Sequence, residues 1–175
     1  MSRLPLEAAG SLVLALLCAG HLLADFVFQS RAMVDGKRRE TRWLLIHGLE
    51  VLLVQAVVLL AFCPSVRAGV ALAGIGLTHV GIDGLKVRVE QRFGRRLLWF
   101  VLDQLLHLAA LFLAARWIAA ESIELTAWAP RRLEGLAWVV GLYAFNVNGG
   151  SAVVSAVLDG VRAGSAPLAG ARAGH

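Results

Sequence analysis

The chain has 175 residues, of which 58% are hydrophobic and 17% are charged, and its mean hydropathy is +0.71. A soluble domain is usually about 45–50% apolar and about 25% charged. The composition therefore excludes a disordered chain, a coiled coil and an ordinary soluble enzyme. It indicates a membrane protein with several transmembrane helices, and the chain has room for about five or six of them.

Five apolar stretches of the chain are long enough to cross a membrane as helices, because one span takes about 20 residues. They cover residues 4–28, 43–62, 70–85, 97–120 and 136–158. Helices are favoured because lipid offers no partner for backbone N–H and C=O groups. The sequence therefore predicts an all-α transmembrane bundle in one domain, residues 1–162, followed by a flexible tail, residues 163–175. The third stretch is rich in glycine, which predicts close packing against neighbouring helices.

The basic residues are concentrated at one end of the predicted spans. Twelve of the 17 Lys and Arg residues lie at that end, namely Arg31, Lys37, Arg38, Arg39, Arg42, Lys86, Arg88, Arg92, Arg95, Arg96, Arg162 and Arg172, and five lie at the other, namely Arg3, Arg67, Arg116, Arg131 and Arg132. Cytoplasmic loops are enriched in Lys and Arg, so this distribution predicts a cytoplasmic C-terminus and an N-terminus outside. It is typical of a multi-pass protein of the bacterial inner membrane.

The same loops account for the net charge of +5 and the pI near 10.2, so no nucleic-acid partner is expected. The expected surroundings are the lipid bilayer, with anionic lipid headgroups at the basic loops. Assembly into a homo-oligomer is left open.

Ionisable side chains recur inside the predicted spans, although each costs about 2.5–3.5 kcal/mol on insertion scales. Four of the five histidines and three of the five aspartates lie there: His21, Asp25, His47, His79, Asp83, Asp103 and His107. Six of these seven form His–Asp pairs four residues apart, a spacing that places both side chains on one helix face. His47 is instead followed three residues later by Glu50. With a rise of about 1.5 Å per residue, the antiparallel spans bring all seven to one depth in the cytoplasmic half of the membrane.

Neutral imidazole and carboxylate groups are the ordinary protein ligands of zinc, manganese and iron. The pattern therefore predicts a divalent metal site with the seven His and Asp residues as ligands, zinc being favoured and manganese or iron being alternatives. Glu50 is the candidate general base because it lies close to His47. A metal ion lowers the pKa of bound water. The leading hypothesis is therefore a metal-dependent hydrolase of a lipid-linked or amphiphilic substrate, whose phosphate or headgroup is attracted by the basic loops.

Two other functions are compatible with the same residues. They would carry protons or a metal ion in a transporter subunit, or they would clamp helices together in a non-catalytic membrane scaffold. The outer halves of the spans are apolar, notably residues 51–62 and 108–113, which argues against a polar path across the membrane. The hydrolase is therefore the leading hypothesis, and the other two functions are kept as alternatives.

Four short strings carry a resemblance to a known family. They are GHLLADFVFQS at residues 20–30, LIHGLE at 45–50, THVGIDGLK at 78–86 and FVLDQLLH at 100–107. In this order and spacing they resemble, over residues 10–110, a family of small bacterial multi-pass membrane proteins of unknown function. The resemblance implies that the seven His and Asp residues act as one set with Gln29, Lys86 and Gln104, which would contact the substrate or support the ligands. More loosely, the chain is similar to proteins labelled membrane-bound metal-dependent hydrolases.

Overall fold

The computed structural model describes residues 6–120 and 130–170, and this part of the chain is helical apart from short turns. The helices are α1 (Leu6–Leu23), α2 (Arg31–Lys37), α3 (Thr41–Leu60), α4 (Val66–Phe93), α5 (Arg96–Ala119), α6 (Pro130–Ala144) and α7 (Gly150–Gly170), with π-helical turns η1 (Ala24–Phe28) and η2 (Phe145–Gly149) after α1 and α6. Five segments are long and apolar enough to span a membrane: Glu7–Phe28, Thr41–Leu60, Val66–Phe93, Arg96–Ala119 and Arg131–Val161. The prediction of an all-α bundle with five spans is therefore confirmed, and the helices indicate a membrane-embedded protein. Arg3, Arg172 and residues 4–5 lie outside the described residues.

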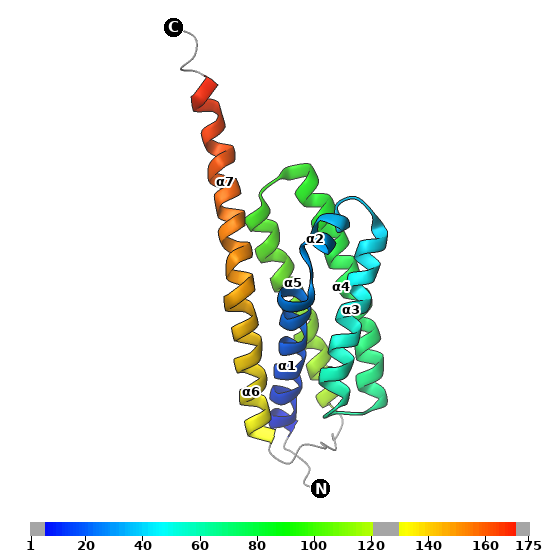
Figure 1. Ribbon diagram of the computed structural model, residues 1–175. Coiled ribbons are helices and arrows are strands. Elements are labelled where there is room, and N and C mark those ends of the chain that lie inside the picture. The colour runs from blue at the N-terminus through cyan, green and yellow to red at the C-terminus, as the bar shows by residue number, and fades with distance from the viewer. Residues whose placement is uncertain (1–5, 121–129, 171–175) are drawn as a thin grey trace.

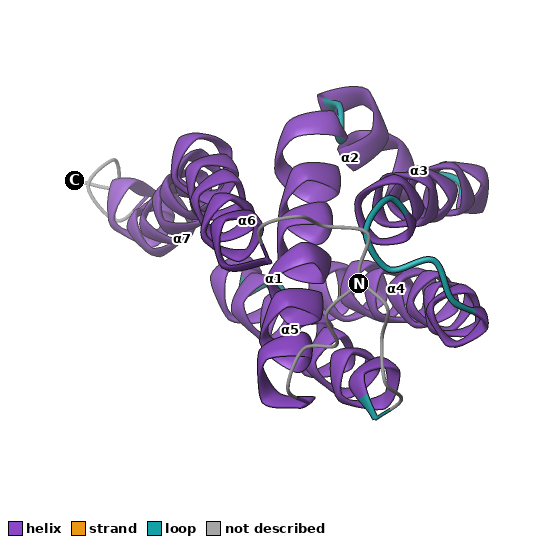
Figure 2. Ribbon diagram, turned by 90° about the horizontal axis from the view of Figure 1, so that it is seen from below, coloured by secondary structure: helices purple, strands orange, loops and turns teal. Residues whose placement is uncertain are grey.

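Helix α1 packs against α3, α5 and α6, and α4 packs against α3 and α5. Helices α1, α3, α4 and α5 therefore form a bundle (Figures 1 and 2). Helices α6 and α7 continue into each other through η2 and form one long rod along the outside of this bundle (Figure 1). Within the rod, α6 contacts α1 and α7 contacts α5.

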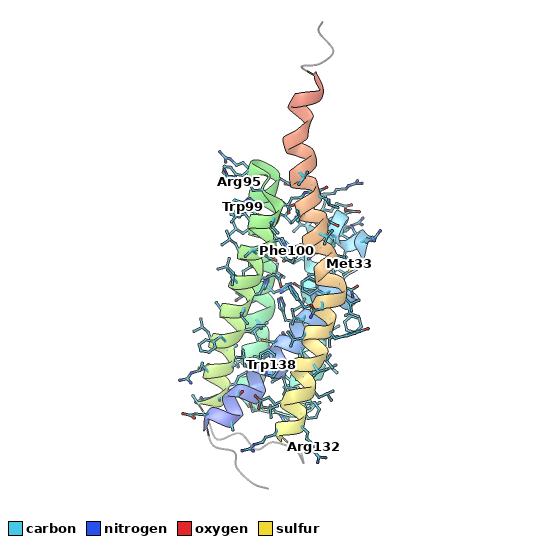
Figure 3. The ribbon with its side chains drawn as sticks, turned by 90° about the vertical axis from the view of Figure 1, so that its left-hand side faces the viewer. Met33, Arg95, Trp99, Phe100, Arg132 and Trp138 are labelled. Carbon is cyan, nitrogen blue, oxygen red and sulfur yellow. The ribbon has the colours of Figure 1, made fainter. Side chains whose placement is uncertain are left out.

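The two predicted basic loops lie at the same end of the bundle. Helix α2, the turn between α4 and α5, and α7 lie at this end, which we call the basic end (Figure 1). The start of α1, the turn between α3 and α4, and the start of α6 lie at the other, which we call the opposite end. Arg95 and Arg132 mark the two ends in Figure 3. The fold thus brings distant basic segments of the sequence together.

The half of the bundle towards the opposite end has an apolar core. Its buried side chains include Leu12, Leu16, Leu17, Leu59, Leu72, Leu111 and Ile118. The outward faces are apolar as well, since Val57 is 72% exposed and Leu77 is 78% exposed. Helices that are apolar on all sides are expected where lipid, rather than water, surrounds the bundle.

Helix α4 extends further in both directions than the predicted span 70–85. Ser65 caps its N-terminus, because the Ser65 hydroxyl accepts a hydrogen bond from the backbone N–H of Ala68 at 3.0 Å. The helix ends at Gly94, whose φ of 66° is a left-handed conformation that glycine adopts without strain. The polar residues after position 85 therefore continue the helix towards the basic end instead of forming a loop.

The C-terminal part also differs from its prediction. Helix α7 continues to Gly170, so residues 163–170 are helical where the sequence predicts a flexible tail. Residues 171–175 lie outside the described residues.

Glycines on both α3 and α4 permit the close approach of these two helices. A Cβ atom on Gly48 of α3 would lie 2.2 Å from the Val80 side chain of α4. Of the glycines in the third predicted span, Gly76 and Gly84 face side chains of α3, whereas Gly69, Gly74 and Gly81 have no such neighbour within 4 Å. Because His47 and His79 directly precede Gly48 and Val80, this contact sets how closely the two histidines approach.

Candidate metal centre

The seven His and Asp residues predicted as metal ligands meet in one buried cluster in the half of the bundle near the basic end. They come from α1, η1, α3, α4 and α5. The exposed fraction of each of these side chains is 9% or less. Three overlapping groups within the cluster each offer three ligand atoms within 4.8 Å of one another. The sequence prediction that these residues share one layer is consistent with this arrangement.

Four atoms form the tightest part of the cluster, and we call them the four-donor group: His47 Nε2, His79 Nε2, Asp25 Oδ1 and Asp83 Oδ2. The two nitrogens lie 3.0 Å apart. Asp25 Oδ1 lies 3.3 Å from His47 Nε2 and 3.7 Å from His79 Nε2. Asp83 Oδ2 lies 3.8 Å from both nitrogens. Ligands of a tetrahedral zinc ion are separated by about 3.3–3.5 Å, given zinc–ligand bonds of about 2.0–2.1 Å. The group therefore has nearly the spacing of a metal ligand shell.

The hydrogen bonds of His47 orient it for metal binding. Its Nδ1 lies 3.1 Å from Glu50 Oε2. A carboxylate only accepts, so Nδ1 carries the proton and Nε2 presents a lone pair to the four-donor group. The Gln29 amide nitrogen lies 2.8 Å from the same Nε2 and donates to it. Glu50 thus contacts His47 on the side away from the donor atoms, which fits a residue that orients a ligand better than the predicted general base.

His107 has the same arrangement on α5. Its Nδ1 donates to the backbone oxygen of Asp103 at 2.9 Å, which leaves the Nε2 lone pair available. Asp103 Oδ2 accepts hydrogen bonds from Lys86 Nζ at 2.9 Å and from Gln104 Nε2 at 3.1 Å. Lys86 and Gln104, which the resemblance adds to the set, therefore hold one oxygen of Asp103 in place.

Several donor atoms of the cluster have no hydrogen-bond partner within the described part of the chain. These buried atoms are Nε2 of His21, Oδ1 of Asp25, Nδ1 of His79, Oδ1 of Asp103 and Nε2 of His107. An unsatisfied buried polar atom costs about 1–3 kcal/mol. Five such atoms are therefore concentrated in one buried cluster of the described residues.

Lys37 is a site residue that the sequence analysis did not identify. Its ammonium group donates to Asp83 Oδ2, and its side chain is 8% exposed. Lys37 reaches the cluster because the chain turns back after η1, where Ser30 caps the short helix α2. Gly36 then packs directly against the Trp43 ring, since a Cβ atom at this position would lie 2.4 Å from it. Helix α2 thus covers the cluster from the basic end.

A compositional signal for Lys37 was present in the sequence. The chain has only two lysines, Lys37 and Lys86, and its other 15 cations are arginines. Both lysines bind aspartates of the cluster. The topology argument counted all cations together and therefore did not separate these two.

The charges of the cluster favour a divalent cation. Its carboxylates are Asp25, Asp83, Asp103 and Glu50, and its ammonium groups are Lys37 and Lys86. With neutral imidazoles, four carboxylates and two ammonium groups leave a net charge of two minus. One divalent cation would balance this charge in a region where an unbalanced charge is expensive.

A pocket of about 270 Å³ opens beside the cluster, between α2, α4, α5 and α7. Its polar side includes Gln29, Lys37, Asp83 and Lys86, and its apolar walls include Val34, Val87, Phe100, Ala152 and Ala156. Figure 3 shows Phe100 on α5 beside the rod formed by α6 and α7. A neighbouring hollow of about 700 Å³ reaches Asp25 and is lined also by Gln104 and Asn148. The cluster is therefore accessible from a space with one polar and one apolar side.

Comparison with known proteins gives a family and no further relative. The model of the family described as "Protein of unknown function (DUF3307)" matches residues 12–133. This region contains every residue of the cluster and most of the bundle. No curated protein and no solved structure matches the chain. The chain belongs to the DUF3307 family of proteins of unknown function.

Proposed function

We propose that this protein binds a divalent metal ion, zinc by preference, in the four-donor group and uses it to hydrolyse an amphiphilic substrate within the membrane. The observation that carries the proposal is that two imidazole nitrogens lie 3.0 Å apart and that two carboxylate oxygens each lie 3.3–3.8 Å from both nitrogens. A donor set of two nitrogens and two oxygens in this spacing suits zinc, and manganese or iron accept the same ligands.

The surroundings of the donors support metal binding. Glu50 fixes the tautomer of His47 in which Nε2 carries the lone pair, and a metal ion there would displace the hydrogen bond that this nitrogen accepts from Gln29. The net charge of the cluster, two minus, is opposite to that of the ion. In a scaffold that only clamps helices together, the buried polar atoms would be hydrogen-bonded to one another. Several buried nitrogen and oxygen atoms of this cluster instead have no hydrogen-bond partner within the described part of the chain.

The pocket supports an amphiphilic substrate. Lys37 and Lys86 offer ammonium groups to an anionic headgroup next to the metal ligand Asp83. Val34, Val87 and Phe100 offer an apolar wall to the rest of the molecule. A metal ion at Asp83 would polarise a carbonyl or phosphoryl oxygen of a substrate bound in the pocket.

The position of the cluster favours a hydrolase over a transporter. Translocation of protons or ions needs polar groups across the whole membrane. The half of the bundle near the opposite end is filled by side chains such as Leu16, Leu59 and Leu111. The pockets beside the polar centre lie in the half of the bundle near the basic end.

The proposed location is the bacterial inner membrane, with the N-terminus outside and the basic end in the cytoplasm, near anionic lipid headgroups. The gathering of both basic loops at one end supports this orientation. A membrane-impermeant thiol reagent should label an Arg39→Cys variant only in inside-out vesicles. Labelling of intact cells from the outside would contradict the orientation.

The experiment for the metal is elemental analysis of detergent-purified protein by mass spectrometry. The wild type should carry bound zinc, manganese or iron, and the His79→Ala/Asp83→Ala variant should lose it while it still elutes as a folded monodisperse protein. A His175→Ala variant, which removes the one histidine outside the predicted spans, is the matched control and should keep the metal. If the folded wild type binds no metal ion even in the presence of excess metal, the proposal is wrong.

The experiment for the reaction uses the metal-loaded protein in vesicles of bacterial lipid extract, with product detection by mass spectrometry. Hydrolysis products should appear with the wild type, disappear after chelation and return when metal is restored. Absence of turnover by the metal-loaded protein would contradict the hydrolase and leave the metal site standing.

A further inference from the structure

Besides Nδ1 of His79, three buried atoms of the cluster are left without a partner when a metal ion is placed in the four-donor group. They are Nε2 of His21, Nε2 of His107 and Oδ1 of Asp103, and none has a hydrogen-bond partner within the described part of the chain. The residues are 5%, 3% and 2% exposed, so water at the surface does not satisfy these atoms. One ion in the four-donor group therefore accounts for only part of the cluster.

The rings of His21 and His107 lie close to each other, and Asp103 is one helical turn from His107. The His21 and His107 rings are 4.8 Å apart between centroids, and the His79 and His107 rings are 4.3 Å apart. The Asp103 carboxylate is on the same α5 turn as His107, with Oδ1 at 3.6 Å from His107 Nδ1. His107 donates its Nδ1 proton to a backbone carbonyl, so its Nε2 has the lone pair that a metal ligand needs.

Asp25 connects the two sets of donors. Its Oδ1 belongs to the four-donor group, at 3.3 Å from His47 Nε2. Its Oδ2 faces the other way and lies 3.7 Å from His21 Nε2. A carboxylate with one oxygen towards each set is the arrangement expected of a ligand that bridges two metal ions.

We propose that the cluster is a two-metal centre, in which a second divalent cation is bound by His21, His107 and Asp103 and shares Asp25 as a bridge with the first ion. This inference rests on the proposed function, because the first ion occupies the four-donor group. The second ion would bind the unpaired atoms of His21, His107 and Asp103 that the first ion does not reach. Paired ions in enzymes lie about 3.5–4 Å apart and together stabilise the attacking and leaving oxygens of a displacement reaction.

The charge of the centre indicates which substrate group it takes. The ligands and lysines balance one divalent cation, so two ions give the centre a net charge of two plus. A phosphate ester, with its anionic oxygens, matches that net charge, which already includes the ammonium groups of Lys37 and Lys86. The amphiphile that the centre hydrolyses is therefore assigned to the phosphate esters. In that reaction water supplies the oxygen that bonds to phosphorus, the bond from phosphorus to the ester oxygen breaks, and the released alcohol takes one proton from the water.

The test counts manganese ions in purified protein equilibrated with excess Mn²⁺ and then desalted. The wild type and the His175→Ala control should retain two equivalents, and His107→Ala and His21→Ala should retain one. The electron paramagnetic resonance spectrum of the wild type should show two exchange-coupled ions, a readout that needs no variant to fold. In His107→Ala the spectrum should change to that of an isolated ion.

The outcomes separate this inference from the proposed function. One equivalent in the wild type, with the spectrum of an isolated ion, overturns the two-metal centre and leaves the single ion of the proposed function intact. A wild type that binds no ion overturns both. The substrate assignment has its own test, in which the protein with two bound ions is given the phosphate-ester lipids of a bacterial extract. If it releases neither inorganic phosphate nor a phosphate monoester from any of them, the assignment of the substrate group is overturned.

Discussion

The two halves of the bundle are formed by the same helices but by opposite kinds of side chain. Towards the opposite end, α1, α3, α4 and α5 pack leucine, alanine and isoleucine against one another. Towards the basic end they bring histidine, aspartate and lysine into one buried cluster. Burial of apolar side chains contributes little to helix association in lipid, because lipid tails are as apolar as the side chains. Close packing therefore holds the opposite half together, whereas the basic half needs its charges balanced.

This contrast means that the two halves should respond differently to substitution. Changes in the apolar half should lower stability and leave metal binding intact. Changes in the cluster should alter metal binding first, and should lower stability wherever they leave a buried charge without its partner.

Removal of Asp83 should have the largest effect, because the Asp83→Ala variant loses a proposed metal ligand and leaves Lys37 buried without its partner. Breaking a buried ion pair in this way costs about 3–5 kcal/mol. Thermal unfolding and metal content measure the two losses. In Lys37→Ala/Asp83→Ala the stability should largely return while the metal remains lost. Asp159→Ala is the control, because its pair with Arg96 is exposed and should contribute less than about 1 kcal/mol.

Truncation of Leu16 tests the apolar half. Leu16 is 2% exposed in the core at the opposite end, so Leu16→Ala should lower the free energy of unfolding by about 2–5 kcal/mol through the cavity it leaves. The metal content of the folded variant should equal that of the wild type. Loss of the metal ion from a well-folded Leu16→Ala protein would show that the two halves are not independent.

Substitution of Glu50 separates two roles for this residue. If Glu50 orients His47, Glu50→Ala should weaken metal affinity by about 10–100-fold. Glu50→Gln keeps an oxygen that accepts from His47 Nδ1 and should lose less. Competition with a chelator of known affinity measures both variants. If Glu50 is instead the general base, both variants should keep the metal ion and lose hydrolysis equally.

A methyl group at Gly48 should have the smallest of these effects. Gly48→Ala places a Cβ atom against Val80 and pushes α3 away from α4, which should lower the free energy of unfolding by about 1–3 kcal/mol. Because His47 and His79 then move apart, the variant should also bind the metal ion more weakly. Gly81→Ala is a matched control, because no other side chain lies within 4 Å of its Cβ position. Gly48→Ala/Val80→Ala should recover affinity. Equal affinity in the Gly48→Ala and Gly81→Ala variants would contradict this account of the contact.

Much of the site follows from helical periodicity. His21 and Asp25, His79 and Asp83, and Asp103 and His107 are each four residues apart, and a helix turns such a pair to one side. Alternating span directions then place the pairs at one depth. The same local reasoning missed Lys37, because its approach to Asp83 depends on the backward turn after η1 and on the packing of Gly36 against Trp43.

The sequence by itself determined that the chain forms apolar helices and that their ionisable residues share one layer, because hydropathy and helical period are local properties. The tertiary structure alone decided which atoms meet. It placed Glu50 on the Nδ1 side of His47, turned the two oxygens of Asp25 towards different histidines, and brought α2 and α7 to the rim of the pocket. These relations depend on helix rotation and on the contacts between helices, which no single stretch of sequence contains.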